Sequence, residues 1–197
     1  EVLYGGEVSS GYDSRIQEND NVAFFQWQRK DAIAGEQSVF LRSEVLFREA
    51  PLVTQDTPPV AIKPDLDQLT TQVQKDFSAA LIKAGVTGEG LVLKVLRELN
   101  SPASQYLGVL LRDNRRRSEQ LQLAISLLGM EGIAARTVRG VLLEDRQRER
   151  SASYMLKVWL DGQWKLYDPK ESQPVPWNEF IVFQEGSAPL FEVEGGV

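Results

Sequence analysis

The stretch SASYMLKVWLDGQWKLYDP, which runs from Ser151 to Pro169, decides the fold because it contains the strongest local structural signal in the chain. Two runs of apolar and aromatic residues meet at Asp161 and Gly162. An Asp-Gly pair between two such runs predicts a β-hairpin with a type I′ turn, since that turn needs positive φ at both of its central residues. We therefore predict two antiparallel strands whose register is fixed by a two-residue loop.

The register of this hairpin predicts which side chains share a face. Counting outward from the turn pairs Leu160 with Gln163, Trp159 with Trp164, Lys157 with Leu166, and Met155 with Asp168. Ser153 and Lys157 are then both diagonal neighbours of Asp168, roughly 7 to 8 Å away between backbones. A histidine at position 153 could reach the aspartate, whereas a serine is too short. Spacing alone favours a simpler interpretation, in which Asp168 is an Asp-Pro turn residue and Lys157 forms a partly solvated ion pair with it.

The composition excludes several classes of function. The 197 residues, 42% of them hydrophobic, are enough to bury a sizeable core. A net charge of -6 argues against nucleic acid as a partner, because phosphate binding needs a basic face. The chain has neither cysteine nor histidine, so disulfides, thiolate catalysis and the commonest general base and zinc ligands are excluded. No EF-hand spacing, phosphate loop or dinucleotide fingerprint occurs, and we expect no metal or cofactor.

Two regions differ in their predicted structure. Residues 1–60 form a β-rich extension, with an irregular arm over 1–20 and strands predicted at 22–28 and 38–47. The segment APLVTQDTPPVAIKP, residues 50–64, is read as a boundary because its paired prolines cannot donate hydrogen bonds to a sheet.

Residues 61–197 are predicted to form an α+β domain in which helices pack on an antiparallel sheet. Apolar residues recur at helical spacing in three segments, which predicts helices over 65–84, from Thr87 to Asn100, and from Ser118 to Gly129. Strands are predicted over 133–143, 154–160, 163–169, 179–184 and 189–194.

One family matches this order of motifs. The third helix, the segment GIAAR from Gly132 to Arg136, and the Asp-Gly hairpin together resemble the core of the transglutaminase-like superfamily, which has the papain-like architecture of cysteine proteases. The resemblance spans roughly residues 87–170. In active members a cysteine opens that helix, a histidine opens the strand before the hairpin in an H-x-W pattern, and an aspartate follows the hairpin.

The resemblance implies that this chain has lost its catalyst. Asp168 matches the aspartate of the family, but Ser153 replaces the histidine and Met155 its neighbouring tryptophan. The cysteine position falls on Ser118 or, one residue earlier, on Arg117. A helix N-terminus lowers the pKa of a thiol, the histidine shares its proton and the aspartate orients the ring, so the three groups act as a unit. We therefore expect a degenerate transglutaminase-like pseudoenzyme and no catalysis.

A closer resemblance is to the catalytically inactive transglutaminase-like domain that bacteria fuse to seven transmembrane helices. It implies a periplasmic domain of an inner-membrane protein, attached to the membrane through segments outside this chain. No apolar run within the chain itself reaches the ~20 residues that span a bilayer. The resemblance further implies a noncatalytic binding or sensory domain with a peptide or protein ligand. We expect that ligand in a cleft lined by Ser118, Ser153, Met155, Lys157 and Asp168.

Two other functions are compatible with the sequence. Ser118 activated by Lys157 would form a serine-lysine dyad in a hydrolase or acyltransferase, although a serine at a helix start more often caps a backbone amide. Alternatively, the domain has a purely structural role in assembly, in which the basic runs RDNRRRS and EDRQRERS, starting at Arg112 and Glu144, dock acidic surfaces. Because cations are unfavourable at a helix N-terminus, Arg117 is expected to have an acidic or anionic neighbour.

Overall fold

The computed structural model describes residues 2–3, 12–19, 22–29, 44–45, 59–62, 68–101, 104, 117–143 and 151–186. The chain divides into two compact units, residues 1–51 and 52–197, which are described separately. The division predicted from sequence fell between residues 60 and 61.

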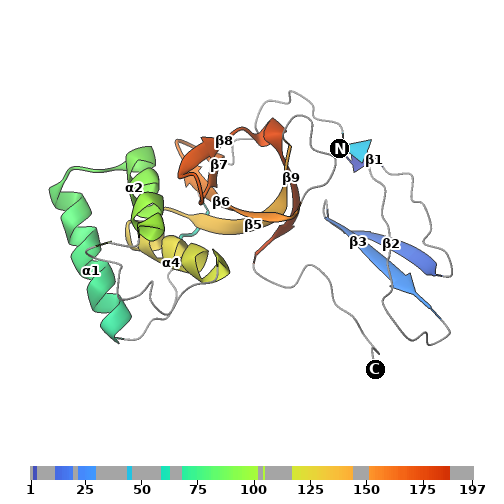
Figure 1. Ribbon diagram of the computed structural model, residues 1–197, viewed down its shortest axis with the longest axis horizontal. Coiled ribbons are helices and arrows are strands. Elements are labelled where there is room, and N and C mark those ends of the chain that lie inside the picture. The colour runs from blue at the N-terminus through green and yellow to red at the C-terminus, as the bar shows by residue number, and fades with distance from the viewer. Residues whose placement is uncertain are drawn as a thin grey trace. The chain divides into compact units, whose positions relative to one another are not determined.

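The first unit contains two pairs of antiparallel strands (Figure 1). Strands β2 (Asp13–Asn19) and β3 (Val22–Gln28) pair along their whole length, and β1 (Val2–Leu3) pairs with β4 (Glu44–Val45). The expectation of an irregular arm over 1–20 is therefore wrong. Most of β2 is polar and exposed, so its strand structure comes from pairing with β3, which a search for apolar alternation does not detect. Strand β3 confirms the prediction for 22–28, whereas of the predicted strand 38–47 only β4 lies within the described residues.

Three helices open the described part of the second unit. They are α1 (Gln68–Lys83), α2 (Gly88–Asn100) and α4 (Arg117–Met130). The predicted helices at these places are confirmed, but the third does not end at Gly129. Gly129 lies within α4, and the stop comes at Gly132, whose φ of 74° is left-handed and whose N–H reaches back to the carbonyl of Gly129.

A five-stranded antiparallel sheet follows the helices. Its order is β8 (Gln173–Val175), β7 (Gln163–Asp168), β6 (Ser153–Leu160), β5 (Ala135–Leu142) and β9 (Phe180–Glu185). A short 3-10 helix, η1 (Trp177–Glu179), connects the two edge strands β8 and β9. The predicted α+β class with an antiparallel sheet is thus confirmed. Strand β8 was not predicted, and the predicted strand 189–194 lies outside the described residues.

The β6–β7 hairpin has the predicted turn and register. Asp161 and Gly162 have φ values of 54° and 76°, as a type I′ turn requires. The predicted pairs Leu160–Gln163, Trp159–Trp164 and Lys157–Leu166 are all formed. The ladder ends at Leu156 and Tyr167, so the predicted pair of Met155 with Asp168 lies one step beyond the last paired residues.

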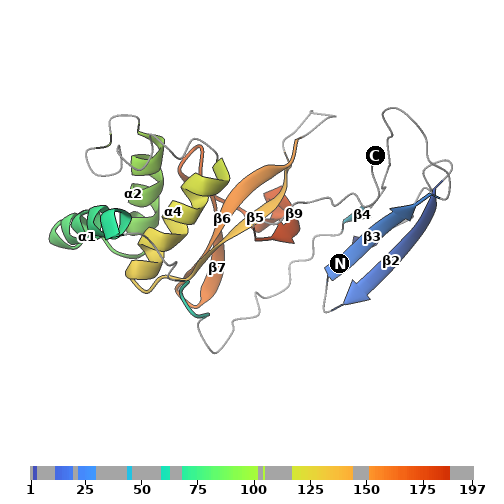
Figure 2. The ribbon, with the colours of Figure 1, turned by 90° about the horizontal axis from the view of Figure 1, so that it is seen from below.

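The two faces of the sheet bury different cores. Helix α4 packs directly on β5 and β6, and α1 and α2 lie on its far side (Figure 2). The core between helices and sheet includes Val92, Leu96, Leu128, Leu156 and Tyr167, each with no more than 1% of its surface exposed. A second, smaller core lies on the other face, made of Val138, Met155, Leu166, Val175 and Phe180. Alternation along β6 therefore sends Leu156 and Val158 toward the helices, and Met155 and Lys157 away from them.

Candidate functional site

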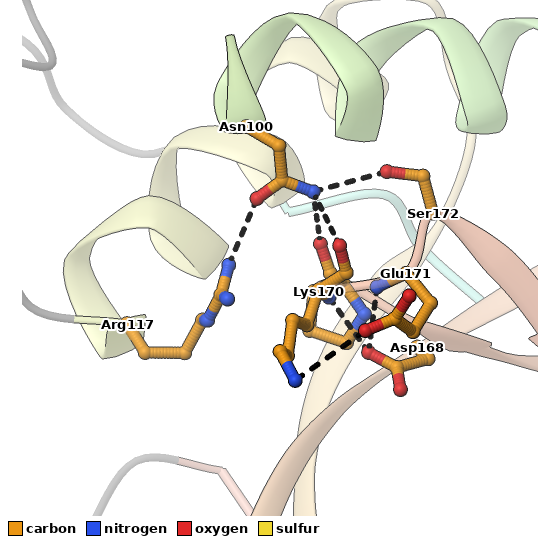
Figure 3. Close-up of polar contacts among 7 residues, drawn as sticks. Asn100, Arg117, Asp168, Lys170, Glu171 and Ser172 are labelled. Atoms are coloured by element: carbon orange, nitrogen blue, oxygen red, sulfur yellow. Dashed lines mark hydrogen bonds and ion pairs between the residues drawn. The ribbon is translucent and has the colours of Figure 1, made fainter. Parts of the chain in front are cut away.

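Part of the sequence-predicted site falls where three element ends meet. Asn100 is the last residue of α2, Arg117 is the first residue of α4, and Asp168 is the last residue of β7. Figure 3 shows these ends joined by polar contacts around the turn that follows β7. We call this region the Asp168 end of the sheet, and the region around Asp161 and Gly162 the turn end.

Asn100 is the centre of the network at the Asp168 end. Its side-chain Nδ2 donates to the carbonyl oxygens of Pro169 and Lys170, at 2.6 and 3.0 Å, and lies 3.0 Å from Oγ of Ser172. Its Oδ1 accepts a hydrogen bond of 3.2 Å from Nη1 of Arg117. One amide thus ties the end of α2 to the start of α4 and to the turn after β7. Sequence reasoning treated Asn100 only as a helix stop, because its partners are distant in the sequence.

The carboxylate of Asp168 accepts hydrogen bonds from the turn that follows it. Its Oδ1 accepts the backbone N–H groups of Lys170 and Glu171, at 2.6 and 3.2 Å. The turn continues through Ser172, whose φ of 53° is left-handed. The interpretation of Asp168 as an Asp-Pro turn residue is therefore confirmed, and neither Ser153 nor Lys157 is among its hydrogen-bond partners.

The candidate nucleophile position lies in the first turn of α4. This helix begins at Arg117, so Ser118 is inside the helix rather than at the capping position that sequence reasoning suggested. The Nη1 of Arg117 donates to Asn100 and, at 3.1 Å, to Oε1 of Gln120. Among the described residues, the hydrogen-bond partners of this cation are neutral amide oxygens, and the acidic or anionic neighbour that the sequence led us to expect is not among them. Residues 112–116 of the first basic run, and 144–150 of the second, lie outside the described residues.

Ser153 and Met155 differ in what they offer a ligand. Ser153 opens β6 opposite Gly140 of β5 and is half-buried. Met155 is only 2% exposed and packs in the second core beside Val138 and Leu166. The prediction that Met155 lines a cleft is not supported, because its side chain fills the interior of the second core.

Lys157 belongs to the turn end. Its Nζ lies 2.8 Å from Oε2 of Glu185 and 4.5 Å from the centre of the Trp164 ring. It points to the face of the sheet that α4 does not cover. The structure therefore does not bring Lys157 to Ser118 or to Asp168, and the predicted dyad and ion pair are not formed.

The turn end is an ion-pair cluster around an aromatic pair. Arg136 Nη1 lies 2.5 Å from Oε1 of Glu185, and its guanidinium carbon is 5.4 Å from the centre of the Trp164 ring. Trp164 packs edge-on against Trp159, with 5.5 Å between ring centres. Burial by itself would raise the pKa of Glu185, but hydrogen bonds from Arg136 and then Lys157 outweigh it and lower that pKa. The cations at this end are stabilised by neighbours on adjacent strands.

Tyr167 offers no base or nucleophile at neutral pH. It is fully buried in the helix-side core, and its hydroxyl has no partner among the described residues. Burial, and then the charges of Glu89 and Asp161, raise its pKa to about 12. The phenol therefore stays neutral and shielded from solvent.

Comparisons with known proteins add no relative. No family model, curated protein or solved structure matches this chain. In the part of the chain that the structure describes, no three carboxylates gather closely enough to hold a metal ion. None of the described helices combines the length and apolar character that a membrane crossing requires. Within the first unit, a shallow hollow is lined by Asp13, Arg15, Gln26 and Gln28 of the β2–β3 hairpin.

Proposed function

We propose that residues 61–197 are a degenerate transglutaminase-like domain that binds a peptide or protein and catalyses no reaction. The observation that carries this proposal is the chemistry of the Asp168 end. By the family resemblance, Arg117 or Ser118 falls where active members have a thiol and Ser153 where they have the base. Asp168, which matches the family's aspartate, accepts hydrogen bonds from its own turn. The chain has no imidazole and no thiol, so the cysteine–histidine chemistry of active members cannot occur at this end.

The arrangement of donors and acceptors supports a binding role. Helix α4 begins at this end with Arg117 and Ser118 in its first turn, and Ser153 opens β6 at the same end of the sheet at which Asp168 ends β7. Such groups can hydrogen-bond the backbone of an extended peptide without reacting with it. We further propose, from the family resemblance, that the domain is periplasmic and coupled to a bacterial inner-membrane protein. An alkaline phosphatase fused to the full-length gene product would be active only if this part of the protein is outside the cytoplasm.

The test of the binding role is chemical-shift mapping of the 15N-labelled chain with pools of short peptides. The expected result is a set of perturbed amides around Ser118, Ser153 and Asp168. Peptide pools that perturb no residue at this end, or only the turn end, would count against the proposal.

The absence of catalysis needs a separate assay. A glutamine-containing peptide with hydroxylamine should yield no hydroxamate, and a fluorophosphonate probe should not label Ser118. Turnover that persists after further purification and disappears in Ser118→Ala would instead establish the enzyme that the proposal denies.

The family resemblance itself can be tested by restoring a thiol. Ser118→Cys and Arg117→Cys, compared with a cysteine at exposed Glu171, report which position has an activated sulfur. In a transglutaminase-like frame, one of the two thiols at the start of α4 should react with iodoacetamide at lower pH than the control, because the helix N-terminus lowers its pKa. Equal pH dependence at all three positions would remove the support for the resemblance.

A further inference from the structure

Arg139 is a half-buried cation whose recorded contacts do not use its hydrogen-bond donors. It lies in β5, opposite Tyr154 of β6 on one side and Gln184 of β9 on the other. Its guanidinium carbon is 5.2 Å from the centre of the Tyr154 ring. Its Nε is buried and has no hydrogen-bond partner, and none of the described residues forms an ion pair with it.

Other cations of the same unit are better satisfied. Arg136 and Lys157 share Glu185, Lys165 pairs with Asp161, and Arg117 donates to two amide oxygens. An aromatic ring attracts a guanidinium, but it accepts none of the directed in-plane N–H bonds that give this group its geometry. A buried N–H donor without an acceptor is destabilising by about 1 to 3 kcal/mol. Because the Nε of Arg139 has almost no accessible surface, a ligand would bind this side chain through its two Nη groups.

Arg139 lies on the side of the sheet that is relevant to the proposed site. Along β5 it alternates in step with Ala135 and Thr137, which face the helices, and Tyr154 packs against the helix-side core. The β6–β7 ladder ends at Leu156 and Tyr167, and two residues further along these strands are Tyr154 and Pro169. The carbonyl of Pro169 accepts from Asn100, which also binds Arg117. The Arg139–Tyr154 pair is therefore at the Asp168 end.

We propose that Arg139 is the receptor for a carboxylate of the bound peptide, with the Tyr154 ring as the platform that holds the guanidinium flat. A planar guanidinium presents paired N–H donors that match the two oxygens of one carboxylate. This inference rests on the proposed function, because it names the ligand group that the peptide-binding domain selects. The carboxylate comes either from the C-terminus of the peptide or from an acidic side chain.

The experiment follows the Nε–Hε signals of the arginines in the 15N-labelled chain during peptide titrations. The probes are acetyl-Ala-Ala-Ala with a free C-terminus, its C-terminal amide, and the amidated peptides acetyl-Ala-Glu-Ala and acetyl-Ala-Gln-Ala. If Arg139 binds the C-terminal carboxylate, only the first peptide should shift its signal. If Arg139 binds an acidic side chain, acetyl-Ala-Glu-Ala should shift it. Arg29 is the internal control, because it lies 5.4 Å from the Tyr12 ring and also has a buried, unpartnered Nε in the other unit.

Substitutions of Arg139 distinguish the effect of its charge from the effect of its paired N–H donors. Arg139→Gln should weaken binding of the carboxylate peptide by roughly ten- to hundredfold, the loss expected for a charged hydrogen-bonded pair. Arg139→Lys keeps the charge without the paired donors and should recover only part of that affinity. The matched control is Arg136→Gln, on the same strand and the opposite face, which should bind as the unmodified chain does. Amide spectra of each variant verify that the fold is intact.

Each outcome bears on a different claim. If acid and amide peptides bind equally at the Asp168 end, the carboxylate inference fails and the proposed binding function stands. If Arg29 shifts as much as Arg139, the effect is nonspecific ion binding and the inference also fails. If acetyl-Ala-Ala-Ala and acetyl-Ala-Glu-Ala both leave Arg139 unshifted while other peptides bind, the receptor is elsewhere. If no peptide of any kind binds, the proposed function fails first.

Discussion

The two ends of the five-stranded sheet differ in how their polar and charged side chains are paired. At the turn end, Arg136 and Lys157 share the carboxylate of Glu185 across neighbouring strands, against the Trp164 ring. At the Asp168 end, carbonyls, amides and a serine from helix ends and a turn satisfy one another through Asn100. The first arrangement joins strands through ion pairs and stabilises the hairpin, whereas the second joins the ends of α2 and α4 to the turn after β7. This difference is why we assign function to the Asp168 end.

The largest effect is expected from Gly140→Ala, at the Asp168 end. A Cβ at this position would overlap the carbonyl oxygen of Ile181, and backbone atoms cannot turn aside as a flexible side chain can. We expect a loss of about 3 kcal/mol in the free energy of unfolding, at the upper end for overpacking, together with loss of the β5–β9 pairing. Urea denaturation of both chains measures the difference.

Gly90→Ala is the matched control for this substitution. A Cβ there meets only a methyl group of Val86 at 3.7 Å, and the residue lies within α2. Alanine should therefore stabilise the helix by up to about 1 kcal/mol. If the two alanines had equal effects, the close approach of β9 to β5 would not be a property of the protein.

Trp164→Ala tests whether the turn end is a stabilising cluster. The substitution removes the edge-on contact with Trp159 and the ring beneath Lys157 and Arg136. Because Trp164 is only half-buried, we expect a cost of about 2 kcal/mol, below that of a fully buried tryptophan. Trp164→Phe keeps an aromatic ring and should lose less than half as much. Amide hydrogen exchange at Asn100 and in the turn after Asp168 should change little, and a loss of protection there would show that the two ends are coupled.

Asn100→Ala tests the other end. It deletes the donor to Pro169 and Lys170 and the acceptor for Arg117, but the group is partly exposed and water can replace some of these bonds. We expect a loss of about 1 to 1.5 kcal/mol, with faster amide exchange in residues 170–172. Asn178→Ala, at an exposed asparagine in η1, is the control and should change stability by less than about 0.5 kcal/mol. Equal effects of the two alanines would mean that Asn100 does not organise the site.

Local signals explain what the sequence predicted correctly. The type I′ turn at Asp161 and Gly162 and the helical stripe of α2 depend on neighbours a few residues apart, and both are formed as predicted. Strand β8 was missed because Pro174 lies in its middle. A proline is tolerated there only because β8 is at the edge of the sheet, where its missing N–H faces no partner strand.

The candidate site was predicted less completely because its partners come from separate elements. The spacing correctly indicated that Asp168 ends a strand and begins a turn, and that α4 begins near Ser118. No spacing links Asn100 to the turn after β7, since that contact depends on how α2 packs. Lys157 was correctly predicted to point to the same face of the sheet as Met155. The sequence did not reveal that α4 covers the opposite face.

The smallest expected effect is the pH dependence of Glu185 at the turn end. Its pKa is lowered in the folded chain, since the bonds from Arg136 and Lys157 outweigh the effect of burial. The carboxylate therefore stabilises the fold above its ordinary pKa near 4.5, and this contribution is lost as the pH falls through the lower folded value. With 38% of the side chain exposed, screening limits the contribution to about 0.5 to 1 kcal/mol.

Urea denaturation at pH 6 and pH 3.5 tests this contribution. Glu185→Gln should be less stable than the unmodified chain at pH 6, and the difference should be smaller at pH 3.5, as the carboxylate of the unmodified chain takes up a proton. Glu179→Gln, at an exposed carboxylate for which no ion pair is recorded among the described residues, should keep the same difference at both pH values. A constant difference for Glu185→Gln would mean that the charges at the turn end do not stabilise the fold. The contrast between the two ends would then rest on the aromatic pair alone.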